Sequence, residues 1–141
     1  SCSRPPMQHS NVACTVMILQ YLTRYASKDQ KELVEKAIKK ANEWLEKAPL
    51  PTQEDLVWRL WGLYTMDREK STSQIEELRK KLNESQRKDG GWNQEKEMDS
   101  DPYATGQTIF ILRLTGSKLD DPILQKGTDY LLKTQFKDGS W

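Results

Sequence analysis

The chain has 141 residues, of which 35% are hydrophobic, and this suits one globular domain with its own core. Its 22 Lys and Arg nearly balance its 21 Asp and Glu, so a net charge of +1 provides no field that attracts nucleic acid. No apolar run reaches the ~20 residues of a transmembrane helix. We therefore expect a soluble chain with no nucleic-acid partner and no transmembrane segment, and the composition does not distinguish a cytoplasmic from an exported protein.

The sequence predicts an all-α fold. Proline and glycine divide it into segments rich in Leu, Ala, Glu, Lys and Arg, without sustained alternation of apolar and polar positions. In chain order, the predicted helices cover residues 12–25, 30–47, 54–66, 73–86, 102–114 and 122–135.

These helices alternate between two kinds. Residues 12–25 are apolar nearly all round, so this helix is expected to be buried on all sides. Residues 30–47 are apolar on one face only and carry Lys and Glu on the other, as a surface helix does. Repeated three times, the alternation predicts αα-hairpins in two layers, with inner helices enclosed by outer ones. The predicted units are an N-terminal extension at 1–10 and hairpins at 11–50, 51–92 and 93–141.

Polar side chains mark four predicted helix starts. A hydroxyl residue followed three positions later by a carboxylate predicts a capping box, and an aspartate before a proline predicts a capped start. The four pairs are Thr52 with Asp55, Ser73 with Glu76, Asp101 with Pro102, and Asp121 with Pro122.

Two hairpins end in the same motif. Residues 86–92 read Gln-Arg-Lys-Asp-Gly-Gly-Trp and residues 135–141 read Gln-Phe-Lys-Asp-Gly-Ser-Trp, 49 positions later. Asp and Gly suit a positive φ after a helix, Trp supplies a large cover, and the Gln amide can tie loose backbone ends. We predict that the motif fastens one hairpin to the next. Its structural residues are Gln86, Gly91, Trp92, Gln135, Gly139 and Trp141.

With the preceding residues 126–132, the second copy resembles the QW motif of squalene-hopene and oxidosqualene cyclases, which is echoed in protein prenyltransferase β subunits. The resemblance covers residues 11–141, although the first hairpin ends at 48–52 without the Gln, Gly and Trp. It implies an α/α-toroid-type repeat, a barrel of inner helices ringed by outer helices. Three hairpins make about half of such a barrel, so we expect a piece of a longer protein or a partner copy.

A narrower resemblance links residues 4–6, 55–63 and 99–107 to bacterial prenyltransferase and squalene-oxidase repeat proteins, whose function is generally unassigned. Class II cyclases of the wider family protonate their substrate with the central Asp of a D-x-D-D motif. Here Asp99-Ser100-Asp101-Pro102 stands at a comparable place, which makes Asp101 and Asp99 candidate catalytic residues. The fourth position is Pro, and an acid needs neighbours that keep it protonated. Helix capping alone explains Asp101.

The histidine and cysteines of the sequence do not favour a metal site or a reactive thiol. Prenyltransferases of this fold hold zinc with Asp, Cys and His, but the one histidine, His9, precedes the repeats and is expected to be solvated. We therefore expect neither a metal site nor a cofactor. Cys14 lies in an apolar stretch and is expected to be buried. Cys2 fits a disulfide with Cys14, an idle surface thiol, or a lipidated start after removal of a signal peptide.

Aromatic side chains on the inner helices are the candidates for a binding surface, because aromatic faces hold isoprenoid chains and stabilise cations. Filling the core between layers is their competing role. Asp55 and Asp101 both start inner helices and are expected near one rim. The candidate binding residues are Trp58, Trp61, Tyr64, Tyr103, Phe110 and Asp55.

The resemblance and the residues together favour a non-catalytic binding or scaffold module for an apolar ligand, such as an isoprenoid, or for a protein partner. The first alternative is a class II terpene cyclase-like isomerase, with Asp101 as the acid and Trp58, Trp61 and Tyr103 lining the pocket. The second is a purely structural repeat that self-associates to complete the ring.

Overall fold

The computed structural model describes residues 10–66 and 71–141, and within these ranges it contains six α-helices, one 3-10 turn and no strand. This confirms the predicted all-α class, and each predicted helix end lies within two residues of the observed one. The interpretations of Cys2, His9 and residues 4–6 lie outside the described residues. The helices are α1 (Asn11–Tyr25), α2 (Lys31–Lys47), α3 (Gln53–Met66), α4 (Thr72–Glu84), α5 (Pro102–Leu114) and α6 (Pro122–Thr134).

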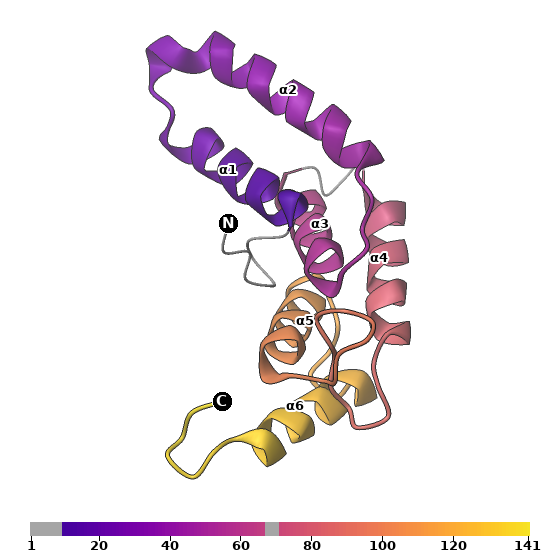
Figure 1. Ribbon diagram of the computed structural model, residues 1–141. Coiled ribbons are helices and arrows are strands. Elements are labelled where there is room, and N and C mark those ends of the chain that lie inside the picture. Colours follow the sequence, from indigo (N-terminus) through magenta and orange to yellow (C-terminus); the bar gives the residue numbers. More distant parts are fainter. Residues whose placement is uncertain (1–9, 67–70) are drawn as a thin grey trace.

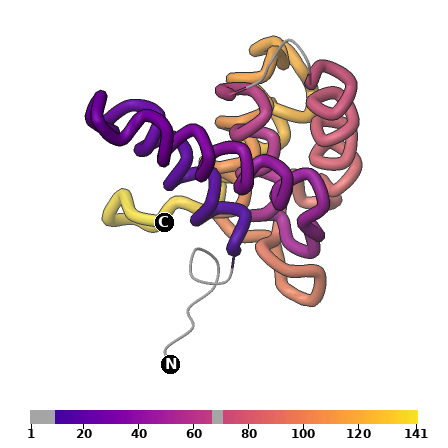
Figure 2. The backbone as a smooth tube through the Cα atoms, turned by 90° about the horizontal axis from the view of Figure 1, so that it is seen from above, coloured from indigo at the N-terminus to yellow at the C-terminus, as the bar shows by residue number. Residues whose placement is uncertain are grey.

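The helices form three successive hairpins along an arc (Figure 1). α1, α3 and α5 lie along its concave side, and α2, α4 and α6 lie along its convex side. α1 packs against α3 and α3 packs against α5, and each inner helix also packs against the outer helix that follows it. Seen from above, the C-terminal turn lies on the same side as α1 and opposite α4 (Figure 2). The predicted two layers are therefore present, bent into an open arc.

Two apolar clusters fill the space between the layers. The larger joins α3, α4, α5 and α6, and the smaller joins α1, α2 and α3. Leu50, in the turn that departs from the repeated motif, packs against both clusters and so connects the first hairpin to the rest. Their most deeply buried members include Leu60, Leu82, Trp92, Ile111, Leu112, Val16 and Leu19. No helix in the described part of the chain is both long and apolar enough to cross a bilayer.

Three of the four predicted helix starts are confirmed. The Asp55 N–H donates to Thr52 Oγ1 at 3.2 Å, and the Thr52 N–H donates to Asp55 Oδ2 at 3.1 Å, which forms a capping box. Asp101 Oδ1 and Asp121 Oδ1 each accept a backbone N–H of the following first turn, at 3.0 and 2.9 Å. The aspartates before proline therefore cap α5 and α6.

The capping box predicted for Ser73 and Glu76 is wrong. The Ile75 N–H donates to the Ser71 carbonyl at 2.9 Å, so α4 already begins at Thr72. Ser71 takes the N-cap position, and Ser73 lies inside the first turn of the helix.

The inner helices are not enclosed on all sides, contrary to the prediction for residues 12–25. Ile18 is 55% exposed and Tyr21 is 57% exposed, whereas Val16 is fully buried. Cys14 is exposed rather than buried, because it shares the helix face of Ile18 and Tyr21. The physical reason is the open arc: no other described element lies over the concave side of α1.

Candidate functional site

The first copy of the repeated motif is a turn closed by its own backbone and side chains. The Arg87 N–H donates to the Gly91 carbonyl at 3.0 Å, and Gly90 adopts a φ of 91° that favours glycine. Gln86 Nε2 donates to the Gly90 carbonyl at 3.0 Å. Trp92 Nε1 donates to the Leu82 carbonyl at 2.8 Å, near the end of the preceding helix. The glutamine and the tryptophan thus brace the turn from its two ends.

The second copy repeats these bonds. The Phe136 N–H donates to the Ser140 carbonyl at 2.8 Å, and Gly139 has a φ of 89°. Gln135 Nε2 donates to the Gly139 carbonyl at 2.8 Å, and Trp141 Nε1 donates to the carbonyl of residue 131 at 2.8 Å. The local fold of the turn is therefore encoded in the motif itself.

The first copy also fastens the second hairpin to the third. Gln86 Nε2 donates to the Ile123 carbonyl of α6 at 2.8 Å, and the Trp92 N–H donates to Thr105 Oγ1 of α5 at 3.0 Å. The Trp92 ring is fully buried, and a Cβ on Gly127 would lie 2.9 Å from it. Gly91 is equally constrained, since an added Cβ would lie 2.7 Å from a side chain of the linking segment.

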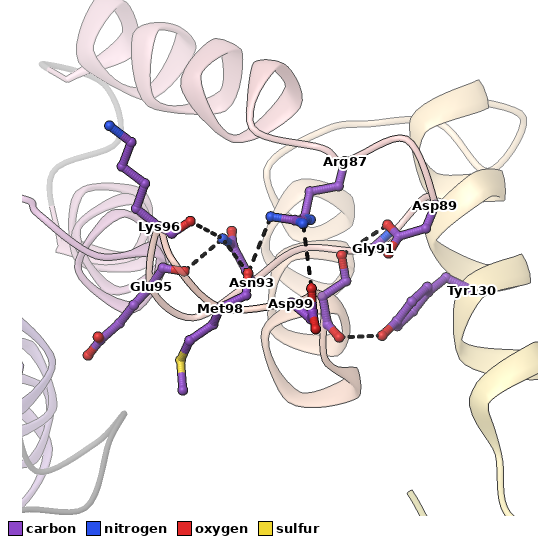
Figure 3. Close-up of polar contacts among 10 residues, drawn as sticks. Arg87, Asp89, Gly91, Asn93, Glu95, Lys96, Met98, Asp99 and Tyr130 are labelled. Carbon is purple, nitrogen blue, oxygen red and sulfur yellow. Dashed lines mark hydrogen bonds and ion pairs between the residues drawn. The ribbon is translucent and has the colours of Figure 1, made fainter.

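The segment between this turn and α5 is held by polar contacts (Figure 3). Arg87 Nη1 donates to the Met98 carbonyl at 3.3 Å, and Tyr130 Oη donates to the Ser100 carbonyl at 2.6 Å. Asp99, a candidate catalytic residue, lies in this segment with an exposed carboxylate 3.9 Å from Arg87 Nη2. It is thus placed at the surface beside a guanidinium.

Aromatic and apolar side chains line the concave side of the arc. Each inner helix presents one stripe at the spacing i, i+4, i+7, i+11, which lies along one helix face. The stripes are Cys14, Ile18, Tyr21 and Tyr25 on α1, Glu54, Trp58, Trp61 and Thr65 on α3, and Tyr103, Gln107, Phe110 and Leu114 on α5. We call this surface the concave face.

Four of the six predicted binding residues meet on the concave face. The Trp58 and Trp61 rings are 4.8 Å apart, and Trp61 makes an edge contact with Phe110 at 6.0 Å. Tyr103 is 39% exposed and Phe110 is 54% exposed. Trp58 is only 8% exposed and belongs to the smaller apolar cluster, so solvent reaches this aromatic patch through Trp61, Tyr103 and Phe110.

A buried carboxylate supports these rings. Trp58 Nε1 donates to Glu54 Oε1 at 2.6 Å, Tyr103 Oη donates to the same oxygen at 3.5 Å, and Gln107 Nε2 donates to Tyr103 Oη at 2.6 Å. Burial raises the pKa of Glu54, and the hydrogen bond from Trp58 offsets part of that rise. Burial and the nearby Glu54 carboxylate raise the pKa of Tyr103 to about 12. The network orients two aromatic rings of the concave face.

Glu54 and Gln107 belong to this site, although the sequence pattern did not predict it. A glutamate in the first turn of a helix usually interacts with the helix dipole at the surface, so a glutamate at position 54 does not by itself indicate a binding site. The available signal was the four-residue spacing between Glu54 and Trp58, which places an indole N–H within reach of a carboxylate.

Two of the remaining candidates, Asp55 and Asp101, have hydrogen-bond partners outside the aromatic patch. Asp55 is 5% exposed and accepts the Ser10 hydroxyl at 2.7 Å, so it points toward the start of α1. Asp101 caps α5, and Tyr64 is half-buried on α3. No group of three His, Cys, Asp or Glu side chains within residues 10–66 and 71–141 could hold a metal ion.

A groove of about 430 Å³ adjoins the concave face at the start of α5. Asp101, Pro102 and Tyr103 form one wall, and Leu131 and Trp141 form the other. The groove thus connects the aromatic patch to the second copy of the motif.

No family model matches the chain, and no curated protein matches it significantly.

Replacing Glu54 by glutamine should flatten the dependence of stability on pH. Because the folded-state pKa of Glu54 lies above its usual 4.5, its stabilising contribution is complete below that value and is lost as pH rises through the folded pKa. The glutamine amide oxygen can still accept the Trp58 N–H without a charge. Between pH 4.5 and neutral pH, the Tm of the wild type should therefore fall relative to that of Glu54→Gln.

The exposed Glu76→Gln variant is the matched control and should follow the wild-type pH profile. Parallel Tm profiles for the wild type and Glu54→Gln would show that burial of this carboxylate does not affect its protonation.

Proposed function

We propose that the chain is a non-catalytic binding module of the α/α-toroid type, which holds an apolar chain such as an isoprenoid against its concave face. The observation that carries the proposal is the exposure of large rings on the inner layer of helices. Tyr21 is 57% exposed and Phe110 is 54% exposed, although each belongs to a helix that packs against a neighbouring inner helix and an outer helix. Exposed apolar surface of this kind is typical of binding sites.

The repeat architecture supports the toroid assignment. Inner helices pack on inner helices, outer helices lie on the convex side, and the Gln–Gly–Trp turns recur with the same hydrogen bonds. A half-barrel of this kind presents its inner layer as one concave surface, as other helical repeat proteins do. The wider fold family binds isoprenoid substrates on that layer, so the resemblance and the exposed rings favour the same surface.

The chemistry of the concave face favours an uncharged apolar ligand. The three stripes contain no Lys or Arg, and their one carboxylate, Glu54, is 3% exposed and turned to the Trp58 indole N–H. Trp61 and Phe110 offer edges and faces that gain contact area without burying a charge. An extended hydrocarbon chain suits such a surface better than a phosphate or a polar sugar.

The surroundings of Asp101 favour binding over cyclisation. A class II cyclase needs a protonated carboxyl directed at its apolar substrate. Asp101 Oδ1 accepts the Ala104 N–H at 3.0 Å in its own helix, and residue 102 is a proline. We expect squalene and prenyl diphosphates to be recovered unchanged after incubation. A cyclised product that Asp101→Asn abolishes would overturn the non-catalytic proposal.

Binding can be tested with farnesol as the isoprenoid probe, by the change in tryptophan fluorescence that contact with Trp61 should produce. We expect a saturable change, and Phe110→Ala should weaken the affinity about tenfold through loss of one aromatic contact. Phe136→Ala is the matched control, since Phe136 is 64% exposed in the C-terminal turn and should leave the affinity unchanged. Equal affinities for the two variants, or a titration that does not saturate, would contradict the proposal.

A further inference from the structure

Arg59 of α3 is a buried arginine whose charge has no direct partner in the described part of the chain. It is 9% exposed, and within residues 10–66 and 71–141 its guanidinium donates no hydrogen bond and forms no ion pair. Burial lowers the pKa of Arg59, and the Glu46 carboxylate offsets part of that change. A guanidinium stays charged in proteins, so its burial without a partner is unfavourable and points to a role other than folding.

The fold does not require an arginine at this position of the repeat. The two motifs are 49 residues apart, and the same offset relates the first residue of α3 to the first residue of α5. It places Thr108 at the position of Arg59. Thr108 is fully buried, accepts Gln53 Nε2 at 2.7 Å and donates to the Ala104 carbonyl at 2.8 Å. The third hairpin therefore has a short side chain with hydrogen-bond partners at this position.

Arg59 lines a cavity of about 290 Å³ between α2, α3 and α4. On α3 the cavity uses residues 59, 62, 63 and 66, which form a helix face separate from the concave face. All of its described walls belong to the first two hairpins, and its volume suits a small molecule. Its apolar side chains are Leu45, Leu63 and Met66, and its other polar side chains are Asn42, Glu46, Ser71 and Gln74.

The start of α4 adds a second group that favours an anion in this cavity. Ser71, the N-cap residue of α4, is 6% exposed, and its side chain makes no hydrogen bond to the first turn. The first turn also carries no acidic side chain. The positive end of the helix dipole is therefore not offset by a carboxylate of its own first turn, where Ser71 and Gln74 border the cavity.

We propose that this cavity binds a small organic carboxylate, held by the Arg59 guanidinium beside the start of α4. A planar guanidinium matches a carboxylate through two parallel N–H···O bonds. Glu46 is the one carboxylate among the described lining residues, and its repulsion disfavours a doubly charged group such as phosphate. Leu63 and Met66 suit an apolar body on the ligand. This inference does not depend on which ligand the concave face binds.

Benzoate is a suitable probe, and benzamide is its uncharged match in shape. The Arg59 Nε–H resonance in a proton–nitrogen NMR spectrum reports contact with the guanidinium, and we expect benzoate to shift it saturably. Benzamide should bind at least about tenfold more weakly, because it has no charge to pair with the guanidinium. An equal response to both compounds, or no saturable shift of this resonance, would overturn the proposal.

Two variants of the cavity should change the benzoate affinity, measured by calorimetric titration, in opposite directions. Arg59→Lys keeps the charge but loses the paired N–H groups, and should weaken the affinity about tenfold. Glu46→Gln removes the repelling charge from an exposed position of α2, and should strengthen the affinity about threefold. Because Glu46 is at the surface, this second variant tests the proposal even if Arg59→Lys does not fold.

The Arg24→Met variant is the matched control. Arg24 is exposed and lines the neighbouring cavity, so its loss removes a guanidinium without touching the proposed site and should leave the benzoate affinity unchanged. Circular dichroism of each variant checks that it keeps its helices. A benzoate affinity that falls in Arg24→Met, or that neither cavity variant changes, would place the anion elsewhere and overturn the proposal.

Discussion

Replacing Trp92 by alanine should destabilise the fold by about 3–5 kcal/mol, whereas Trp141→Ala should cost less than about 1 kcal/mol. The Trp92 ring is 0% exposed and lies at the junction of α4, α5 and α6, so its removal leaves a cavity there. It also leaves the buried Leu82 carbonyl without the indole N–H. Trp141 donates an equivalent bond, but its ring is 54% exposed and fills no interior space.

Urea unfolding followed by circular dichroism measures both losses. Trp141→Ala serves as the internal control because it removes the same side chain from the same turn. Similar losses for the two variants would show that the first copy does not join the second hairpin to the third.

The Asp55→Ala variant should lose about 2–4 kcal/mol, since it removes a buried acceptor shared by two elements. Asp55 accepts the Ser10 hydroxyl at 2.7 Å and the Thr52 N–H at 3.1 Å, which connects the start of α1 to the start of α3. Ser10 is 4% exposed, so its hydroxyl would lose this partner away from water. Asp101→Ala should lose about 1 kcal/mol, as a helix cap with one backbone bond does.

Equilibrium unfolding measures the loss of stability in Asp55→Ala and Asp101→Ala, and Asp55→Asn provides a second comparison. The asparagine keeps the shape and one acceptor oxygen, so it should recover part of the lost stability. If Asp55→Ala lost no more than Asp101→Ala, the contact between α1 and α3 would not depend on this carboxylate.

The helix boundaries could be predicted because local residues determine them. Asp101 and Asp121 each stand before a proline, and this pair specifies both a cap and the first helical position. The closed turns could be predicted for the same reason, since their bonds connect residues within each motif or to the last turn of the preceding helix. The start of α4 could not, because Ser71 and Ser73 are equally good capping residues in the sequence.

The exposed side of each inner helix could not be predicted from the pattern. An almost wholly apolar segment such as α1 gives no preference for the side that faces solvent, so burial all round was the natural expectation for Ile18 and Cys14. The curvature of the arc determines which side of each inner helix faces solvent. This curvature depends on small rotations between hairpins rather than on composition. The role of Glu54 was missed for a related reason, since Tyr103 reaches it from another helix.

The closed geometry of the second turn has a thermodynamic consequence for any partner. Gln135, Asp138 and Trp141 already hold the backbone in the shape that the first copy has when it is covered. A partner would therefore meet a preorganised surface and would not have to order a loose chain, an ordering that removes about 1–2 kcal/mol of conformational entropy per residue. Association at this end should accordingly show little change in helix content, because the binding energy is not consumed in folding.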